Sequence, residues 1–535
     1  MSFRALLFVS AVGLIGCGPQ TGERECPGGI TDTDTDRFNC GGCGNTCADG
    51  FNCFGGKCLA GECAPGAVED CYSGAEGTEG IGPCVGGTRT CVNGAWSACE
   101  GEVLPVGEDG PRCSDGIDNN CNGAVDENED RDGDGQSTCG GDCCDSTECD
   151  KPHLVNSGAF DAAGNNFDDD CNGIVDDTPL LCDQGIASNT TNALDFARAI
   201  DICQTATMTD RKWGVIEGSL TLVDGTGTPD PKGHAVRPQF GTGLLPQGGI
   251  NLAILSTGAA AAKGDTNPAY ENFGGYQHVG TQSCPSGLGT ISGTTCSPYP
   301  PDFFAANSNT IPNAPGCPAP DATVQANDPV MLTFKIRVPT NAKSFKLSTN
   351  FYSAEFPEWT CSRYNDFFVV LLDSTYNGSP ANPTDKNLAF YQPQGSMNKY
   401  PVGVNLGHGN TGLFTQCVNG QTGCSGTMSG TISTCVGTDH LAGTGFDDPS
   451  TRCNTNSLVG GATGWLVTSG NVTPGEIMTL RIGIWDTSDH SFDSLAVIDG
   501  FQWSTEVAQP GTVIFNERPP LDSPPAALAG TVLAH

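Results

Sequence analysis

Alternation of apolar and polar positions marks the C-terminal part of this 535-residue chain. In residues 477–485 every second side chain is apolar, so one face of an extended backbone can be buried. The residues on that face are Met478, Leu480, Ile482 and Ile484. Similar strand-like segments, separated by turns rich in Gly, Pro, Asn and Asp, occupy 213–223, 343–353, 366–374 and 494–503. With one amphipathic helix expected at about 192–203, the pattern predicts a mainly β fold, a β-sandwich of jelly-roll type, over residues 182–507.

Residues 17–103 lack this periodicity and are rich in cysteine instead. Such a stretch cannot bury a core and needs covalent or metal cross-links. Cys40 and Cys43 form a CxxC pair, but no second pair with zinc-finger spacing and no histidine follow, which favours disulfides over zinc. Near the end of the region, Asn93-Gly94 predicts the tight turn of a small hairpin.

The first residues have the pattern of an export signal, because one basic residue precedes a short apolar stretch. The sequence Leu14-Ile15-Gly16-Cys17 resembles the lipobox of bacterial lipoproteins, which implies removal of residues 1–16 and lipidation of Cys17. Lipoproteins of this kind imply an outer-membrane, lipid-anchored location, facing the cell surface or the periplasm. The alternative is an ordinary secreted protein that is cut nearby.

Composition agrees with export. The chain has 61 acidic and 24 basic residues, a balance that disfavours nucleic acid and favours cations as partners. Its 29 cysteines indicate an oxidising compartment.

Acidic residues concentrate in 104–181, which we call the acidic segment. Between residues 108 and 177 it holds twenty Asp or Glu and three basic residues, a density that calls for counterions. In the run DRDGDG, Asp130, Asp132 and Asp134 alternate and a glycine follows, as at the start of an EF-hand calcium loop. The position of the final bidentate glutamate is glycine, so a complete EF-hand is not expected and Asp142 or Asp145 is the candidate to close the site.

Two acidic boxes flank that run and form an internal repeat, with Cys121 aligned on Cys171. Their carboxylate and amide side chains are candidate ligands of a hard cation. The candidates are Asp115, Asp118, Asn120, Asn122, Asp126, Glu127, Asp168, Asp170, Asn172, Asp176 and Asp177. The alternative is a solvated acidic linker folded by Asx turns.

The run DRDGDG, the stretch GDCCDST and the box FDDDCNG together resemble the MopE-type metal-binding repeats of bacterial surface proteins. The resemblance implies a disulfide at Cys113 and Cys121. Because Ala163 replaces the first of these in the second box, Cys171 has to pair elsewhere, with Cys144 or Cys149 as candidates. The family name suggests copper, but copper prefers imidazole or sulfur and the segment contains only His153, so calcium is the expected cofactor and is expected to stiffen a core-poor stalk.

Sequence segments such as NFYSAEFPEW and IGIWDTSDHSFDSLAVIDGFQW resemble the choice-of-anchor L domain of bacterial surface proteins. The resemblance covers roughly residues 182–507. The strongest matches are Glu355, Pro357, Glu358, Asn365, Asp366, Trp485, Asp486, Asp489, Asp493, Ser494 and Asp499. Asp486, Asp489 and Asp493 are candidates for a second cation site, or else turn and cap residues of neighbouring strands.

No HExxH, GxSxG or P-loop motif is present, and we expect no enzyme. The expected function is a calcium-binding surface lipoprotein that presents its β domain for adhesion or envelope interaction, with a surface glycan, a matrix or a protein as ligand. Alternatives are a hydrolase acting on polysaccharide and a purely structural envelope protein. The Pro- and Ala-rich residues 508–535 are expected to form a disordered tail.

Overall fold

The computed structural model describes residues 22–108, 110–126, 130–145, 151–177, 181–273, 296–320, 325–424, 430–448, 460–488 and 492–514. The chain divides into two compact units. The first comprises residues up to 130 together with 137–141, and the second comprises 131–136 together with 142 onward. The predicted signal sequence, Cys17, Cys149 and most of the predicted tail lie outside the described residues. Within the described part, no helix has the length and apolar character needed to cross a membrane.

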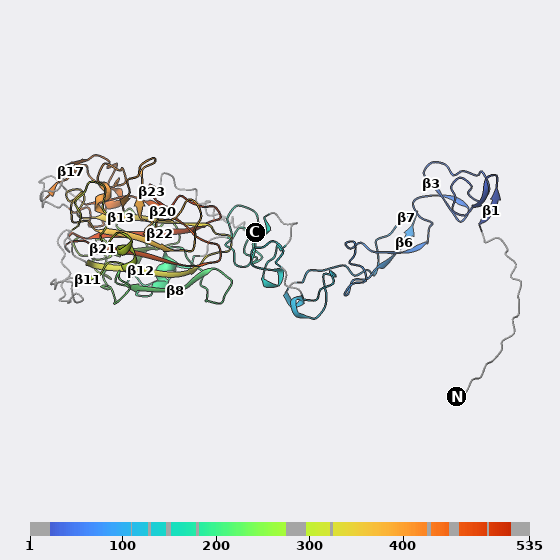
Figure 1. Cartoon of the computed structure of the whole chain (residues 1–535), viewed down its shortest axis with the longest axis horizontal. Helices are drawn as coiled ribbons and strands as arrows, with labels where there is room; N and C mark the ends of the chain where they lie inside the picture. The colour runs from blue at the N-terminus through green and yellow to red at the C-terminus, as the bar shows by residue number, and fades with distance from the viewer. Residues whose placement is uncertain are drawn as a thin grey trace, which may run out of the picture. The chain divides into compact units, whose positions relative to one another are not determined.

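The first unit consists of short antiparallel hairpins (Figure 1). Disulfides cross-link these hairpins. Its strands are β1 (Glu23–Cys26), β2 (Gly29–Asp32), β3 (Phe51–Phe54), β4 (Lys57–Ala60), β5 (Val68–Cys71), β6 (Gly87–Val92) and β7 (Ala95–Trp96). Two 3-10 helices, η1 (Gly110–Ser114) and η2 (Thr138–Gly140), follow. The residues predicted to turn between β6 and β7, Asn93 and Gly94, have φ of 55° and 85°, as a tight hairpin turn requires.

Disulfides take the place of an apolar core in this unit, as predicted. They are Cys26–Cys43, Cys40–Cys53, Cys47–Cys58, Cys63–Cys91, Cys71–Cys99, Cys84–Cys121 and Cys113–Cys139. The two cysteines of the CxxC pair are therefore both oxidised and do not form a zinc site.

The disulfide partners implied for the acidic boxes are wrong. Cys113 and Cys121 are both oxidised but not with each other, because residues 82–84 pack against the first box: a Cβ on Gly82 would collide with the carbonyl oxygen of Asp118. In the second box Cys171 bonds to Cys143. In both boxes, the central cysteine bonds to a segment that precedes the box.

The second unit is built on two antiparallel sheets (Figure 1). The seven-stranded sheet contains β9 (His234–Arg237), β10 (Leu252–Ser256), β13 (Ser344–Ser353), β19 (Gly461–Ala462), β20 (Leu466–Asn471), β22 (Ser494–Ser504) and β23 (Gly511–Ile514). The five-stranded sheet contains β8 (Gly214–Thr221), β11 (Cys296–Ser297), β12 (Ala326–Arg337), β14 (Phe367–Asp373) and β21 (Ile477–Asp486).

Shorter elements complete this unit. They are α1 (Ala193–Ala199), α2 (Pro301–Ala306), β15 (Phe390–Tyr391), β16 (Tyr400–Pro401), β17 (Gly420–Gln421), β18 (Thr431–Ile432), η3 (Pro152–Leu154), η4 (Val404–Gly407) and η6 (Asp439–Leu441). Helix α1 is shorter than predicted: the Asn192 side chain caps its start, and it ends by Ile200.

One apolar core is shared by the two sheets. Phe345 and Leu347 of β13 and Ile498 of β22 belong to it, together with Leu332 of β12. The predicted inward face of β21 lies in the same core, with Met478, Leu480, Ile482 and Ile484 all fully buried. The shared core confirms the mainly β fold and supports the predicted sandwich.

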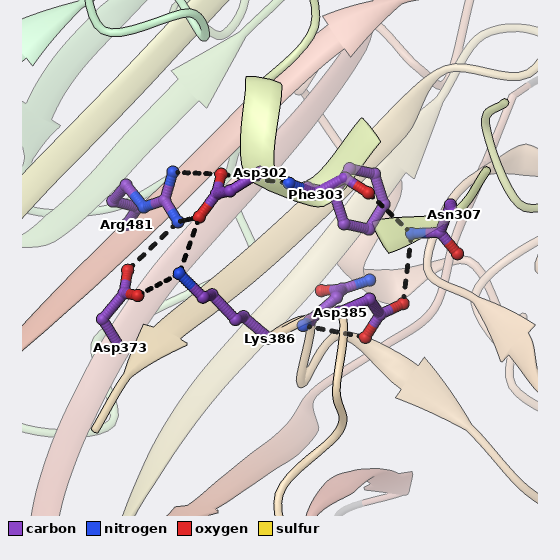
Figure 2. Close-up of polar contacts among 8 residues, drawn as sticks. Asp302, Phe303, Asn307, Asp373, Asp385, Lys386 and Arg481 are labelled. Atoms are coloured by element: carbon purple, nitrogen blue, oxygen red, sulfur yellow. Dashed lines mark hydrogen bonds and ion pairs between the residues drawn. The ribbon is translucent and has the colours of Figure 1, made fainter. Parts of the chain in front are cut away.

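Helix α2 is fixed on the five-stranded sheet by a network of ion pairs (Figure 2). Arg481 donates two hydrogen bonds to Asp302, of 3.0 and 2.5 Å, and contacts Asp373 at 3.1 Å. Lys386 bridges the same two carboxylates. Phe303, the next residue of helix α2, is fully buried in one apolar cluster with Trp485. The ion pairs therefore orient the helix, and aromatic packing holds it against the sheet.

Replacing Asp302 by Asn tests this network. Burial alone would raise the pKa of Asp302, but Arg481 and Lys386 outweigh burial and lower that pKa below its ordinary 3.8. The folded protein therefore gains stability from the ionised carboxylate above pH 3.8 and loses this contribution as the pH falls toward the lowered pKa. In urea unfolding at pH 7, we expect Asp302→Asn to lower the free energy of unfolding by about 1–2 kcal/mol, since the pairs are partly exposed.

The difference between wild type and Asp302→Asn should shrink when unfolding is repeated near pH 3. The exposed Asp439 provides the control, and Asp439→Asn should change little at either pH. An equal difference at both pH values would contradict the role assigned to the ionised carboxylate.

Candidate metal centre

The two acidic boxes fold in the same way. In the first, Asp118 accepts hydrogen bonds from the backbone N–H of Asn122 at 3.2 Å and of Gly123 at 2.8 Å. In the second, Asp168 accepts the equivalent bonds from Asn172 and Gly173 at 3.0 and 2.8 Å. The repeat seen in the sequence is thus a repeated backbone structure.

The remaining box residues have matching local roles. Asn120 and Asp170 each accept from the N–H two residues on, as do Asn122 and Asn172. Asp126 accepts from Gly116, and Asp176 accepts from Gly164 and its neighbours. Asp115 accepts from Ile117. Asp177 accepts from the Nδ2 of Asn172, and Glu127 lies outside the described residues.

These contacts are the Asx turns that the sequence left open as an alternative. A carboxylate that accepts one or two N–H groups still has lone pairs for a cation. The box residues therefore fold their own loops, and their role as ligands stays a prediction.

Two acidic residues that support the boxes were not singled out from the sequence. Glu108 accepts from the N–H of Asn119 at 2.6 Å, and Asp161 accepts from the equivalent N–H of Asp169 at 3.3 Å. Each precedes its box by a different number of residues, so aligning the boxes does not reveal it.

The strongest group of possible ligands lies in the second unit. Asp132, Asp134 and Asp142 each offer an oxygen, and these oxygens lie within 4.8 Å of one another. Asp145 is close enough to act electrostatically on Asp142, and its Oδ1 accepts the N–H of Arg131 at 2.6 Å. Asp142 and Asp145, the residues predicted to close the calcium loop, therefore lie near Asp132 and Asp134. Asp130, the first residue predicted for this loop, ends the first unit.

Short-range hydrogen bonds hold these carboxylates in place. Oδ1 of Asp132 accepts from Asp134 N at 3.1 Å, and Oδ1 of Asp134 accepts from Gln136 N at 2.7 Å. Oδ1 of Asp142 accepts from Cys144 N at 2.7 Å. Gly133 and Gly135 have φ of 80° and 92°, a left-handed conformation that lets the backbone turn between ligands.

Asp142 has a buried carboxylate whose charge is poorly compensated by the described residues. The residue is 2% exposed, and within the described structure its Oδ2 accepts no hydrogen bond. Burial, followed by the charges of Asp134, Asp132 and Asp145, raises the pKa of Asp142 to about 7. A cation placed among these oxygens would remove the repulsion and satisfy the buried atom.

The donor set fits a hard cation. All three candidate ligands in the cluster are carboxylate oxygens, which lie within 4.8 Å of one another. Two oxygens bound to one ion at about 2.3–2.6 Å each can be that far apart. The neighbouring cysteines Cys139, Cys143, Cys144 and Cys171 are oxidised, so they offer no thiolates. His153 lies in η3 and belongs to no metal-ligating group of the described residues.

The cluster is tied to the β-sandwich through one buried amide. Asn156, fully buried, donates its Nδ2 to Oδ2 of Asp134 at 2.6 Å. Its Oδ1 accepts from Gln136 Nε2 and from Thr340 Oγ1, both at 2.7 Å, and Thr340 lies in the connection between β12 and β13. A contact of the backbone reinforces this link, since Thr340 N donates to Gly158 O at 3.0 Å.

The second predicted cation site, between the end of β21 and the start of β22, has fewer clustered ligands among the described residues. Asp486 and Asp493 are buried, at 2% and 3% exposure, while Asp489 lies outside the described residues. Among the residues that are described, neither belongs to a group of three metal ligands. This site stays a prediction.

Comparison with protein families finds two matches. Residues 305–501 match the Choice-of-anchor L domain, and residues 107–127 and 150–177 match the family described as "Putative metal-binding motif", of MopE type. No curated protein and no solved structure matches the chain. The motif matches cover the two boxes. Asp132, Asp134 and Asp142 lie between the two matched ranges in the sequence. Together the matches indicate a surface-associated protein with a metal-binding motif.

Asn156→Ala tests the link between the carboxylate cluster and the sandwich. The change removes the hydrogen bonds that Asn156 makes with Gln136, Thr340 and Asp134, and it should destabilise the contact locally by about 2–3 kcal/mol. We expect faster hydrogen exchange at the amide of Thr340, measured by mass spectrometry. Asn398→Ala, on an exposed loop, is the control, and unchanged exchange at Thr340 in Asn156→Ala would contradict the link.

Proposed function

We propose that this chain, which combines a choice-of-anchor L domain with a MopE-type metal-binding motif, is a lipid-anchored outer-membrane protein that binds Ca²⁺ and presents its β domain for adhesion. The metal has a structural role. It holds together the carboxylates of Asp132, Asp134 and Asp142 in the second unit. The proposal assigns no catalytic step to the chain.

Asp142 is the observation that supports metal binding most directly. Its buried Oδ2 lacks a hydrogen-bond partner among the described residues, and one of its carboxylate oxygens lies within 4.8 Å of oxygens of Asp132 and Asp134. An arrangement with that much buried like charge is unfavourable unless a proton or a cation is taken up. At neutral pH outside a cell, a divalent cation is the available partner.

Calcium is favoured over other metals by the donor atoms. Oxygen ligands in a flexible loop suit Ca²⁺, whereas copper and zinc prefer imidazole or thiolate. Magnesium also binds oxygen, but it demands a near-ideal octahedron and keeps several waters. The Asx-turn loop of Asp132 and Asp134, with its two left-handed glycines, has the irregular geometry that the larger ion accepts.

Asp142→Asn tests calcium binding with little disturbance of the fold. The amide oxygen can still accept the N–H of Cys144, while one of the clustered charges is removed. By calorimetry on the full chain with its disulfides intact, we expect the affinity of one calcium ion to fall at least about tenfold, or ~1.4 kcal/mol. In chelator, the variant should melt at the same temperature as wild type or higher, because like-charge repulsion has been relieved.

The matched control for this change is Asp49→Asn, an exposed aspartate of the first unit whose replacement should leave calcium binding unchanged. Equal calcium affinity in wild type and Asp142→Asn would remove the cluster from the proposal. Tighter binding of copper than of calcium would contradict the assignment of the metal.

The anchor and the adhesive role are tested together in the producing cell. Deletion of the gene should reduce attachment to a surface, and wild type should restore it. Cys17→Ala should not, because the unlipidated protein leaves the membrane fraction. Normal attachment of the deletion strain would favour the purely structural alternative, and Cys17→Ala protein retained in membranes would contradict the lipid anchor.

A further inference from the structure

A second group of buried carboxylates lies in the sandwich, away from every residue considered so far as a ligand. Asp183 precedes helix α1, Asp201 directly follows it, and Asp499 lies in strand β22. Asp183 is 1% exposed and Asp499 is fully buried. The segments are held side by side, since Phe501 N donates to Ile200 O at 3.0 Å.

The three carboxylates surround one strip of backbone, residues 247–251, which leads into strand β10. Oδ2 of Asp499 accepts from the N–H of Gln247 and from that of Gly248, the latter at 3.3 Å. Oδ2 of Asp183 accepts from the N–H of Ile250 and of Asn251, both at 2.7 Å. Each of these carboxylates thus has one oxygen fixed by the strip.

Glycines in the strip make room for the third carboxylate. A Cβ on Gly248 would collide with the carboxylate of Asp201. A Cβ on Gly249 would lie 2.7 Å from Oδ2 of Asp183 and 3.1 Å from Oδ1 of Asp201. Oxygens of Asp183 and Asp201 therefore border the same point, which a larger residue would fill.

No positive charge balances this group among the described residues. Burial, followed by the charge of Asp183, raises the pKa of Asp201 to about 7, and burial with the charge of Asp201 raises that of Asp499 well above its ordinary value. The nearest basic residue in sequence, Arg198, is engaged by Asp195. Oδ1 of Asp183 is buried and accepts no hydrogen bond in the described structure.

We propose that Asp183 and Asp201 bind one divalent cation of the hard, oxygen-seeking class, with Ca²⁺ as the expected ion and Asp499 as the negative charge behind it. Oδ1 of Asp183 and the carboxylate of Asp201 are the ligands. The ion joins the end of α1 to the strip before β10. It therefore locks a segment outside the matched family domain, around residues 183–201, onto β22 within it.

The proposal is independent of the carboxylate cluster around Asp142, so the experiment is done in its absence. The parent is the full chain carrying Asp142→Asn. Into it Asp201→Asn is introduced, a change that suits the backbone, since asparagine tolerates the left-handed φ of 72° found there. Calcium is titrated by calorimetry, and melting is followed with calcium and with chelator.

We expect Asp201→Asn to bind one calcium ion fewer than the parent and to lose most of the rise in melting temperature that calcium produces. In chelator it should melt at the same temperature as the parent or higher, which shows that the variant folds. Asp499→Asn should weaken calcium binding less, and the exposed Asp439→Asn should bind as the parent does.

An unchanged number of calcium ions in Asp201→Asn would overturn the proposal. The proposal would also be overturned if the parent bound no calcium and its melting temperature rose as the pH fell from 7 to 5. That result would assign a shared proton to these carboxylates in place of a metal.

Discussion

Burying a carboxylate is the physical problem to which much of this structure responds. Taking an ionised group out of water costs several kcal/mol unless hydrogen bonds or an opposite charge compensate for it. The chain carries a formal charge of −37, so side-chain cations are too few to compensate for all of its acids. Asp302 has Arg481 and Lys386, but Asp118 and Asp168 rely on backbone N–H groups. Where neither suffices, as at Asp142 and Asp201, we propose that a metal ion supplies the opposite charge.

The two units meet the cost of ordering the chain in different ways. In the first unit, disulfides such as Cys40–Cys53 close short loops that have almost no apolar surface to bury. The second unit buries aromatic and aliphatic side chains from both sheets. The second acidic box goes with the second unit, because Asn156 donates its N–H to the carbonyl oxygen of Asp169 in the box and accepts a hydrogen bond from Thr340. Its stability is therefore coupled to the sandwich, and it is more than a flexible linker.

Features that depend on neighbours in sequence could be predicted. Asn93-Gly94 specified its turn, and alternation specified β21. The spacing of Asp132 and Asp134 indicated that their carboxylates lie close together, while their role as ligands stays a prediction. Strand β10 was not singled out, because all five of its residues are buried and no alternation marks it. The disulfide partners of Cys121 and Cys171 could not be deduced, because spacing alone leaves many connectivities open.

The same limit applies to the sites. Asp183, Asp201 and Asp499 are brought together only by the register of β10 against β22 and by the position of helix α1, so no motif contains them. The two carboxylate groups have one property in common: their loops are already held by backbone hydrogen bonds. A preformed loop loses little conformational freedom on binding, which permits binding without a complete EF-hand. Extracellular calcium modules bind with dissociation constants of about 10⁻⁴–10⁻³ M, a range that a few fixed carboxylates can reach. At the proposed location outside the cell, binding in this range would be tight enough for calcium to be a permanent part of the fold.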